Sequence, residues 1–133
     1  MNNDEQKIVC IDFDGTITKE DCFPKIGRIR RGARQYINQL RADGHCIIVS
    51  SCREGKYKDE AIRVLNQFVI KFDHFNEGSP KRAAKFGCES RKISADVYID
   101  DKHIGTLPRT WKKIYKKINK KPLFKTIKYL RFN

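Results

Sequence analysis

The stretch KIVCIDFDGT, residues 7–16, decides the fold of this chain. It begins with a short apolar run and ends in acidic residues, which is the pattern of a strand buried on both faces. Similar short runs follow at residues 45–50 and 96–99, and a weaker one at residues 71–75. The sequence therefore predicts four strands, the first of which carries two carboxylates at its end.

Helical patterns separate these runs. Apolar residues recur at helical spacing over residues 32–44 and again from Asp59 onward, while residues 110–121 carry a third apolar stripe. Ser79 followed by proline predicts a short helix to about residue 86. Strands that alternate with helices, each strand apolar throughout, predict an α/β fold, a single Rossmann-like domain whose parallel sheet carries helices on both faces.

Length and composition indicate one soluble globular domain. The chain has 133 residues, of which 39% are hydrophobic and 34% charged. Its longest apolar runs have about four residues, too short for a membrane helix, and the polar start MNNDEQK does not have the form of a secretory signal. The five cysteines form no CxxC motif, which favours thiols in a reducing, cytoplasmic setting.

The formal net charge of +13 is concentrated at one end of the chain. Residues 102–133 hold 11 of the 29 Lys and Arg residues and no Asp or Glu, which leaves 18 basic against 16 acidic residues in the rest. We divide the chain into a domain over residues 1–121 and a basic amphipathic extension over residues 122–133. Residues 112–131 are predicted either to pack as a solvated terminal helix or to bind an anionic polymer or membrane surface.

Polar residues follow the predicted strands where a ligand would bind. Ligands of open α/β sheets bind at the carboxyl ends of the strands. Carboxylates gathered there repel one another unless a cation lies among them, and an all-oxygen cluster suits Mg²⁺ with a phosphate in its shell. The residues in question are Asp12, Asp14 and Thr16 after the first strand, Ser51 and Arg53 after the second, and Asp100 and Asp101 after the fourth.

The acidic motifs resemble those of a known superfamily. DFDGT resembles the first motif, DxDGT, of the haloacid dehalogenase superfamily, and Ser51, Lys92 and Asp100-Asp101 resemble its second, third and fourth motifs in order. The resemblance covers residues 7–118. Members that carry both Asp residues of the first motif are Mg²⁺-dependent phosphatases or phosphotransferases. The resemblance therefore implies an enzyme that hydrolyses phosphate monoesters through an aspartyl-phosphate.

Each motif position carries an expected role. The resemblance implies that Asp12 attacks phosphorus and that Asp14 protonates the leaving oxygen and then activates water. Ser51 and Lys92 would bind the phosphoryl oxygens, with Ser50 as the alternative serine and Lys81 as the alternative lysine. Mg²⁺ would be held by Asp12, Asp100 and Asp101 and by Asp14, the last through its backbone carbonyl. The substrate-binding set is completed by four further residues, Gly15, Thr16, Cys52 and Arg53; Cys52 is alternatively a core thiol, and Arg53 a partner of the carboxylates or a surface residue.

The chain departs from the superfamily pattern in having no room for a cap domain. Residues 17–31 are long enough only for a flap, in which Phe23 and Lys25 either contact substrate or pack on the scaffold. Capless members have open sites that suit large phosphorylated substrates or polymer ends, or that a neighbouring subunit covers. The alternative function is a non-catalytic polyanion-binding module with a vestigial site.

Overall fold

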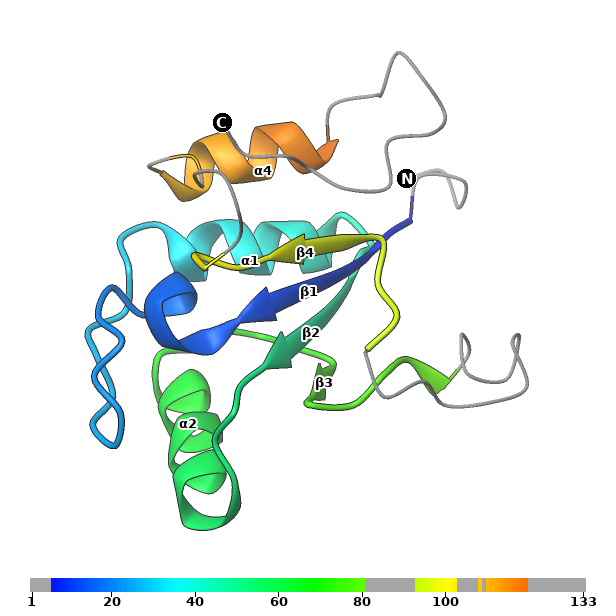
Figure 1. The fold of residues 1–133 in the computed structure, drawn as a ribbon. Helices are drawn as coiled ribbons and strands as arrows, with labels where there is room; N and C mark the ends of the chain where they lie inside the picture. The colour runs from blue at the N-terminus through cyan, green and yellow to red at the C-terminus, as the bar shows by residue number, and fades with distance from the viewer. Residues whose placement is uncertain (1–5, 81–92, 103–107, 109, 120–133) are drawn as a thin grey trace.

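A computed structural model describes residues 6–80, 93–102, 108 and 110–119. Within them four parallel strands form one sheet in the order β3-β2-β1-β4 (Figure 1). The strands are β1 (Ile8–Asp12), β2 (Cys46–Ser50), β3 (His74–Phe75) and β4 (Val97–Ile99). This sheet and its helices confirm the predicted single α/β domain of the Rossmann-like class.

Three α-helices accompany the sheet: α1 (Ala33–Ala42), α2 (Gly55–Gln67) and α4 (Trp111–Asn119). A single wide turn, η2 (Phe13–Ile17), follows β1 directly. The prediction that the second helix starts at Asp59 was wrong by four residues, because its first turn is polar and shows no apolar periodicity. The helix predicted from Ser79 to about residue 86 and the extension over residues 122–133 lie outside the described residues.

One face of the sheet carries the main core. Register partners in parallel strands share a face, and Val9 of β1 is aligned with Ile47 of β2 and with Val97 of β4. These residues join one buried cluster with apolar side chains of all three helices. The helical members are Ala33, Ile37 and Leu40 of α1, Ala61 and Leu65 of α2, and Trp111, Ile114 and Ile118 of α4. The apolar stripe predicted for the terminal helix is therefore confirmed as a packing surface.

The third strand is shorter than the predicted run of residues 71–75. The chain approaches β2 through Asp73, whose backbone N–H donates to the carbonyl of Ile47 at 2.8 Å. The Asp73 carboxylate accepts the N–H of Ile47 at 2.8 Å and also contacts Arg41 at 3.1 Å. A side chain thus supplies part of the pairing that a longer strand would supply through its backbone.

The carboxyl ends of the strands face the same side of the domain, where η2 and the loop after it lie (Figure 1). Of the cysteines the structure describes, Cys10 is buried and Cys52 is exposed. The interpretation of Cys52 as a core thiol was therefore wrong. In the described part of the chain no helix is both long and apolar enough to cross a bilayer.

Candidate active site

Three carboxylates meet where β1 and β4 end, and we call Asp12, Asp100 and Asp101 the acidic triad. Each of them offers one carboxylate oxygen, and these oxygens lie within 4.8 Å of one another. The two strands are direct neighbours in the sheet, so the residues that follow them emerge side by side. The triad contains three of the four residues that the sequence predicted as metal ligands, and the fourth is Asp14.

The triad perturbs the titration of Asp12. Burial, followed by the negative charges of Asp100, Asp101 and Asp14, raises the pKa of Asp12 to about 7, while Lys102 acts in the opposite direction. Without a cation, burial and the crowded negative charge therefore favour the protonated form of Asp12 more than in a free aspartate. The donor set is all oxygen, as a hard divalent cation such as Mg²⁺ prefers, and such a cation would offset the crowded negative charge. The residues present therefore fit Mg²⁺.

Two residues of η2 hold the triad in place. The Thr16 hydroxyl lies 3.4 Å from Oδ2 of Asp12 and 3.3 Å from Oδ1 of Asp101, and it accepts the backbone N–H of Asp101 at 3.1 Å. Gly15 has φ +84°, and a Cβ atom there would lie 2.5 Å from Oδ2 of Asp101. Only glycine meets both demands, since the backbone is left-handed and the carboxylate occupies the side-chain space. Both residues therefore serve first to shape the turn and to support the triad.

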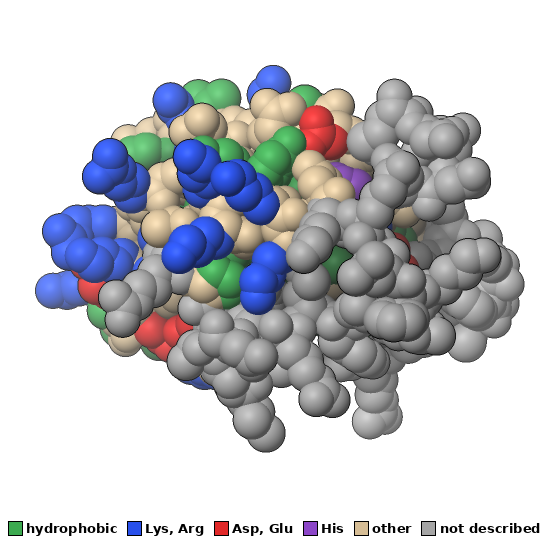
Figure 2. All heavy atoms as spheres, turned by 90° about the horizontal axis from the view of Figure 1, so that it is seen from above, with side chains coloured by type: hydrophobic (Ala, Val, Ile, Leu, Met, Phe, Trp, Pro, Cys, Tyr) green, Lys and Arg blue, Asp and Glu red, His purple; other side chains and the backbone are tan. Residues whose placement is uncertain are grey.

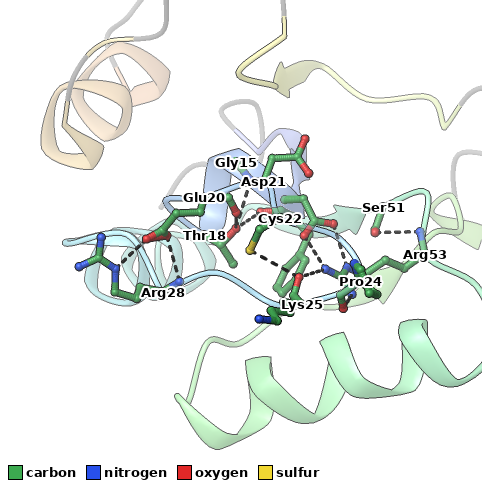
Figure 3. Close-up of polar contacts among 12 residues, drawn as sticks. Gly15, Thr18, Glu20, Asp21, Cys22, Pro24, Lys25, Arg28, Ser51 and Arg53 are labelled. Carbon is green, nitrogen blue, oxygen red and sulfur yellow. Dashed lines mark hydrogen bonds and ion pairs between the residues drawn. The ribbon is translucent and has the colours of Figure 1, made fainter.

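Asp14 is bound by a buried arginine. Nε and Nη2 of Arg53 donate to the two carboxylate oxygens of Asp14 at 2.9 and 2.8 Å, and Arg53 is only 2% exposed. The same guanidinium donates to the carbonyls of Pro24 at 3.2 Å and Lys25 at 2.7 Å (Figure 3). Of the interpretations left open for Arg53, the structure shows the partner of a carboxylate, and the surface position was wrong.

The carboxylate of Asp14 therefore stands apart from the acidic triad. Strand alternation predicts Asp14 on the same side as Asp12; β1 ends at Asp12, and Asp14 lies in η2 and is not one of the three clustered carboxylates. Asp14 remains close enough to raise the pKa of Asp12. Phe13, between them, is fully buried in the core, as predicted. The four predicted carboxylates thus divide into a triad and one arginine-bound neighbour.

Ser51 lies at the end of β2 with its hydroxyl fixed by the following turn. Its Oγ accepts the backbone N–H of Arg53 at 3.0 Å, so the hydroxyl proton remains to be donated to a ligand. Its own backbone N–H donates to Oδ1 of Asn76 at 2.7 Å. Asn76 has φ +58°, a left-handed conformation that asparagine tolerates better than most residues. The two bonds orient a residue that the sequence predicted as a phosphate ligand.

The loop after η2 closes into a flap, residues 18–29. Thr18 and Ile29 form an antiparallel bridge, and Lys19 N–H donates to the carbonyl of Arg28 at 2.7 Å. Lys102 bonds Asp21 at 2.9 Å, which ties the flap to the chain after β4. The prediction that this stretch forms only a flap is confirmed for the described residues.

Sequence reasoning missed several residues that support the site. Arg30 donates to the carbonyl of Gly15 at 2.9 Å and to that of Thr16 at 3.2 Å, and so fixes the backbone of η2. It stands among other arginines in the sequence, and nothing local distinguishes it.

Lys92 and Lys81, the two candidates for the phosphate-binding lysine, lie outside the described residues.

The fold and the acidic strand ends define a small Rossmann-like α/β domain with a candidate metal site. A solved structure of a conserved protein from Bacteroides thetaiotaomicron is 34% identical to this chain, with a TM-score of 0.74, and the match covers 85% of this chain and 89% of that one. The chain belongs to the same family as that conserved protein. A scan against protein-family models and a search of the curated proteins found no match.

Proposed function

We propose that this protein is a Mg²⁺-dependent phosphate monoester hydrolase that works through an aspartyl-phosphate, as the haloacid dehalogenase resemblance implies. The observation that carries the proposal is the acidic triad, whose oxygens lie within 4.8 Å at the ends of two adjacent strands. One of its members, Asp12, is the residue that the resemblance assigns as nucleophile. A structural acidic cluster would not need a serine hydroxyl and a second, separately held carboxylate at neighbouring strand ends.

The residues divide the chemistry between them. An Asp12 oxygen attacks phosphorus, the bond from phosphorus to the leaving oxygen breaks, and the leaving oxygen takes the proton of Asp14, which enters this step as the carboxylic acid. Water then attacks phosphorus and gives its proton to Asp14, which releases inorganic phosphate and restores Asp12. The hydroxyl of Ser51 donates to a phosphoryl oxygen. When bound between Asp12, Asp100 and Asp101, Mg²⁺ supplies positive charge that offsets the carboxylates and the phosphate.

Arg53 acts in this proposal as a positioning residue. Its two bonds fix both oxygens of Asp14, and each oxygen keeps a lone pair with which to handle the substrate proton. Because the arginine is buried and also bound to the flap, Asp14 and the flap share one support. Cys52 is exposed beside it, where it can contact a bound substrate.

The test compares the wild type with Asp12→Asn on a chromogenic aryl phosphate in the presence of Mg²⁺. We expect the wild type to turn over and the variant to lose activity by at least about a thousandfold, since no nucleophile remains. Asp59→Asn, which removes an exposed carboxylate of α2, is the control and should retain full activity. Wild type that is as inactive as the Asp12 variant across a broad panel of phosphates would refute the proposal.

The open site bears on partners and location. A flap of this size covers the site only in part, so the proposal extends to large phosphorylated substrates or polymer ends, and to cover by a second copy of the chain. A cytoplasmic location belongs to the same proposal, and the free thiols of Cys22 and Cys52 support it.

A second candidate function, binding of an anionic polymer, is supported by α4. Lys112, Lys113 and Lys116 are exposed on the side of α4 that faces away from its buried stripe. Figure 2 shows Lys and Arg side chains gathered on this face of the molecule, with few acidic side chains among them. Because the apolar stripe of α4 is buried, the described part of this segment offers lysines to a partner, as a soluble polyanion would require.

Charge reversal tests this second candidate. Lys113→Glu combined with Lys116→Glu should weaken binding to a short DNA duplex, and the binding of the wild type should fall with salt at a slope near −0.9 per phosphate contacted. Lys71→Glu, at an exposed position outside α4, is the matched control. Equal DNA affinity of all three proteins would remove α4 as a binding surface.

A further inference from the structure

An aromatic pair stands at the rim of the candidate site. Phe23, in the flap, is 56% exposed, and its ring meets that of Tyr57 edge to face, with 5.0 Å between centroids and 62° between planes. Tyr57 belongs to the first turn of α2, the end that follows β2. The pair therefore joins the flap to the helix that starts at the site.

The pair is held next to the reacting groups by Arg53. The guanidinium carbon of Arg53 lies 5.1 Å from the centre of the Phe23 ring, and the nitrogens of the same group bond the carboxylate of Asp14. Its bonds to the carbonyls of Pro24 and Lys25 fix the backbone immediately after Phe23. A single guanidinium thus separates the exposed ring from the carboxylate that would handle the leaving group.

A cationic side chain contacts the aromatic pair. Lys25 and Lys56 are both exposed, and Nζ of Lys56 lies 5.2 Å from the centre of the Tyr57 ring. Exposed aromatic rings with lysines beside them attract flat, electron-rich or anionic ligands through stacking and charge. An exposed phenylalanine that packs on Tyr57, with Lys56 at the ring of that tyrosine, is placed to bind a ligand.

We infer that Phe23 and Tyr57 form the leaving-group subsite, and that the substrates are phosphate monoesters whose leaving group carries a flat aromatic or heteroaromatic ring. This inference rests on the proposed phosphatase function. The phosphoryl group lies at the acidic triad, while the ring stacks on Phe23 on the other side of Arg53. The shared chemistry is a ring linked to a phosphate, which an aryl phosphate and a nucleoside monophosphate both supply.

Other exposed apolar side chains do not share this setting. Phe68 is 45% exposed and Val69 is 52% exposed, but both lie just beyond the end of α2. At about 1.5 Å per residue, the 13-residue helix separates them by about 20 Å from the end that carries Tyr57. Phe68 therefore provides a matched control, an exposed phenylalanine far from the site.

The test measures binding to protein that carries Asp12→Asn, so that turnover does not interfere. In the presence of Mg²⁺, the affinities of phenyl phosphate, adenosine 5′-monophosphate and ethyl phosphate are compared by calorimetric titration. We expect at least one ring-bearing phosphate to bind about tenfold more tightly than ethyl phosphate, as one stacked ring contributes. The two ring-bearing arms distinguish an aryl from a nucleoside leaving group.

Variants then assign the preference to the aromatic pair. The quantity compared is the affinity for the preferred ring-bearing phosphate divided by the affinity for ethyl phosphate. Adding Phe23→Leu should bring this ratio to about one, and Phe23→Tyr should restore it. Phe68→Leu should leave it at the parent value. Urea unfolding of each variant checks that the domain is folded. A ratio near one in the parent protein would overturn the subsite, and so would a ratio that Phe23→Leu does not change. The same result is expected if a second copy of the chain covers Phe23, and it would equally overturn the subsite.

The same experiments separate this inference from the proposed function. Wild type that hydrolyses phosphate monoesters, while neither ring-bearing phosphate binds the Asp12→Asn protein more tightly than ethyl phosphate does, keeps the phosphatase and removes the subsite. Wild type that hydrolyses no phosphate, while its affinity for ring-bearing phosphates depends on Phe23, keeps the ring-binding site and removes the phosphatase.

Discussion

The crowding of negative charge around Asp12 makes a prediction about stability. The pKa of Asp12 is raised from 3.8 to about 7, first by burial and then by Asp100 and Asp101. A raised carboxyl pKa means that the folded protein binds the proton more tightly than the unfolded chain does. The ionised form therefore destabilises the fold, with no penalty below about pH 4 and the full penalty above about pH 7.

The magnitude follows from the size of the shift. About three pKa units at about 1.4 kcal/mol each give an upper bound of about 4 kcal/mol. Asp12 is only partly buried, so solvent screening reduces this to about 2 kcal/mol. In the absence of divalent cations, Asp12→Asn should therefore be more stable than the wild type by about 2 kcal/mol at pH 8, and the gain should disappear at pH 4.

Urea unfolding in EDTA at pH 4, 6 and 8 measures this difference. Mg²⁺ should reverse the order at pH 8, because it stabilises the charged triad of the wild type more than that of the variant. Asp59→Asn, at an exposed position of α2, should stay within about 0.5 kcal/mol of the wild type throughout. The reasoning fails if Asp12→Asn differs from the wild type by the same amount at pH 4 and at pH 8.

Three further substitutions test other parts of the structure. Gly15→Ala places a Cβ atom 2.5 Å from Oδ2 of Asp101 at φ +84° and should lower the free energy of unfolding by about 1–2 kcal/mol. It should also weaken Mg²⁺ binding about tenfold in a calorimetric titration, and unchanged affinity would contradict the described geometry. Arg53→Lys keeps the charge but loses the bidentate contact with Asp14, and should lower the free energy of unfolding, measured with urea, by about 2–3 kcal/mol. Proteolysis of the flap should also become faster, and cleavage rates equal to those of the wild type would contradict the role of Arg53 as a support. Tyr115→Phe removes a 2.6 Å bond to Asp43 and should cost about 1 kcal/mol, with no effect on Mg²⁺ affinity.

The strands and two of the helices could be predicted because their signals are local. The apolar run at residues 45–50 became β2, and the run at residues 96–99 became β4, each with a shift of about one residue at an end. The stripe of Trp111, Ile114 and Ile118 predicted α4 for the same reason, since helical spacing and burial coincide there. Acidic residues at strand ends predicted the three members of the triad together with Asp14.

The remaining features depend on contacts between distant parts of the chain. Arg53 and Asp14 are 39 positions apart, and the sequence alone does not show which of many arginines faces which carboxylate. The same holds for Asn76, which supports Ser51 from 25 positions away. The early start of α2 at Gly55 escaped prediction because its first turn carries polar residues and so has no periodic apolar signal.

The paired base of the flap is a position at which another segment could be inserted into the domain. Thr18 and Ile29 are paired at its base, so the chain leaves and re-enters the domain at neighbouring positions. The entropy of closing a loop rises slowly with its length, and a longer segment or a folded module could replace the residues between them without displacing β1. Such an exchange would remove the loop carbonyls that Arg53 binds, and the new segment would have to supply others. Substrate access could thus be redesigned at one junction while the sheet and its carboxylates stay as they are.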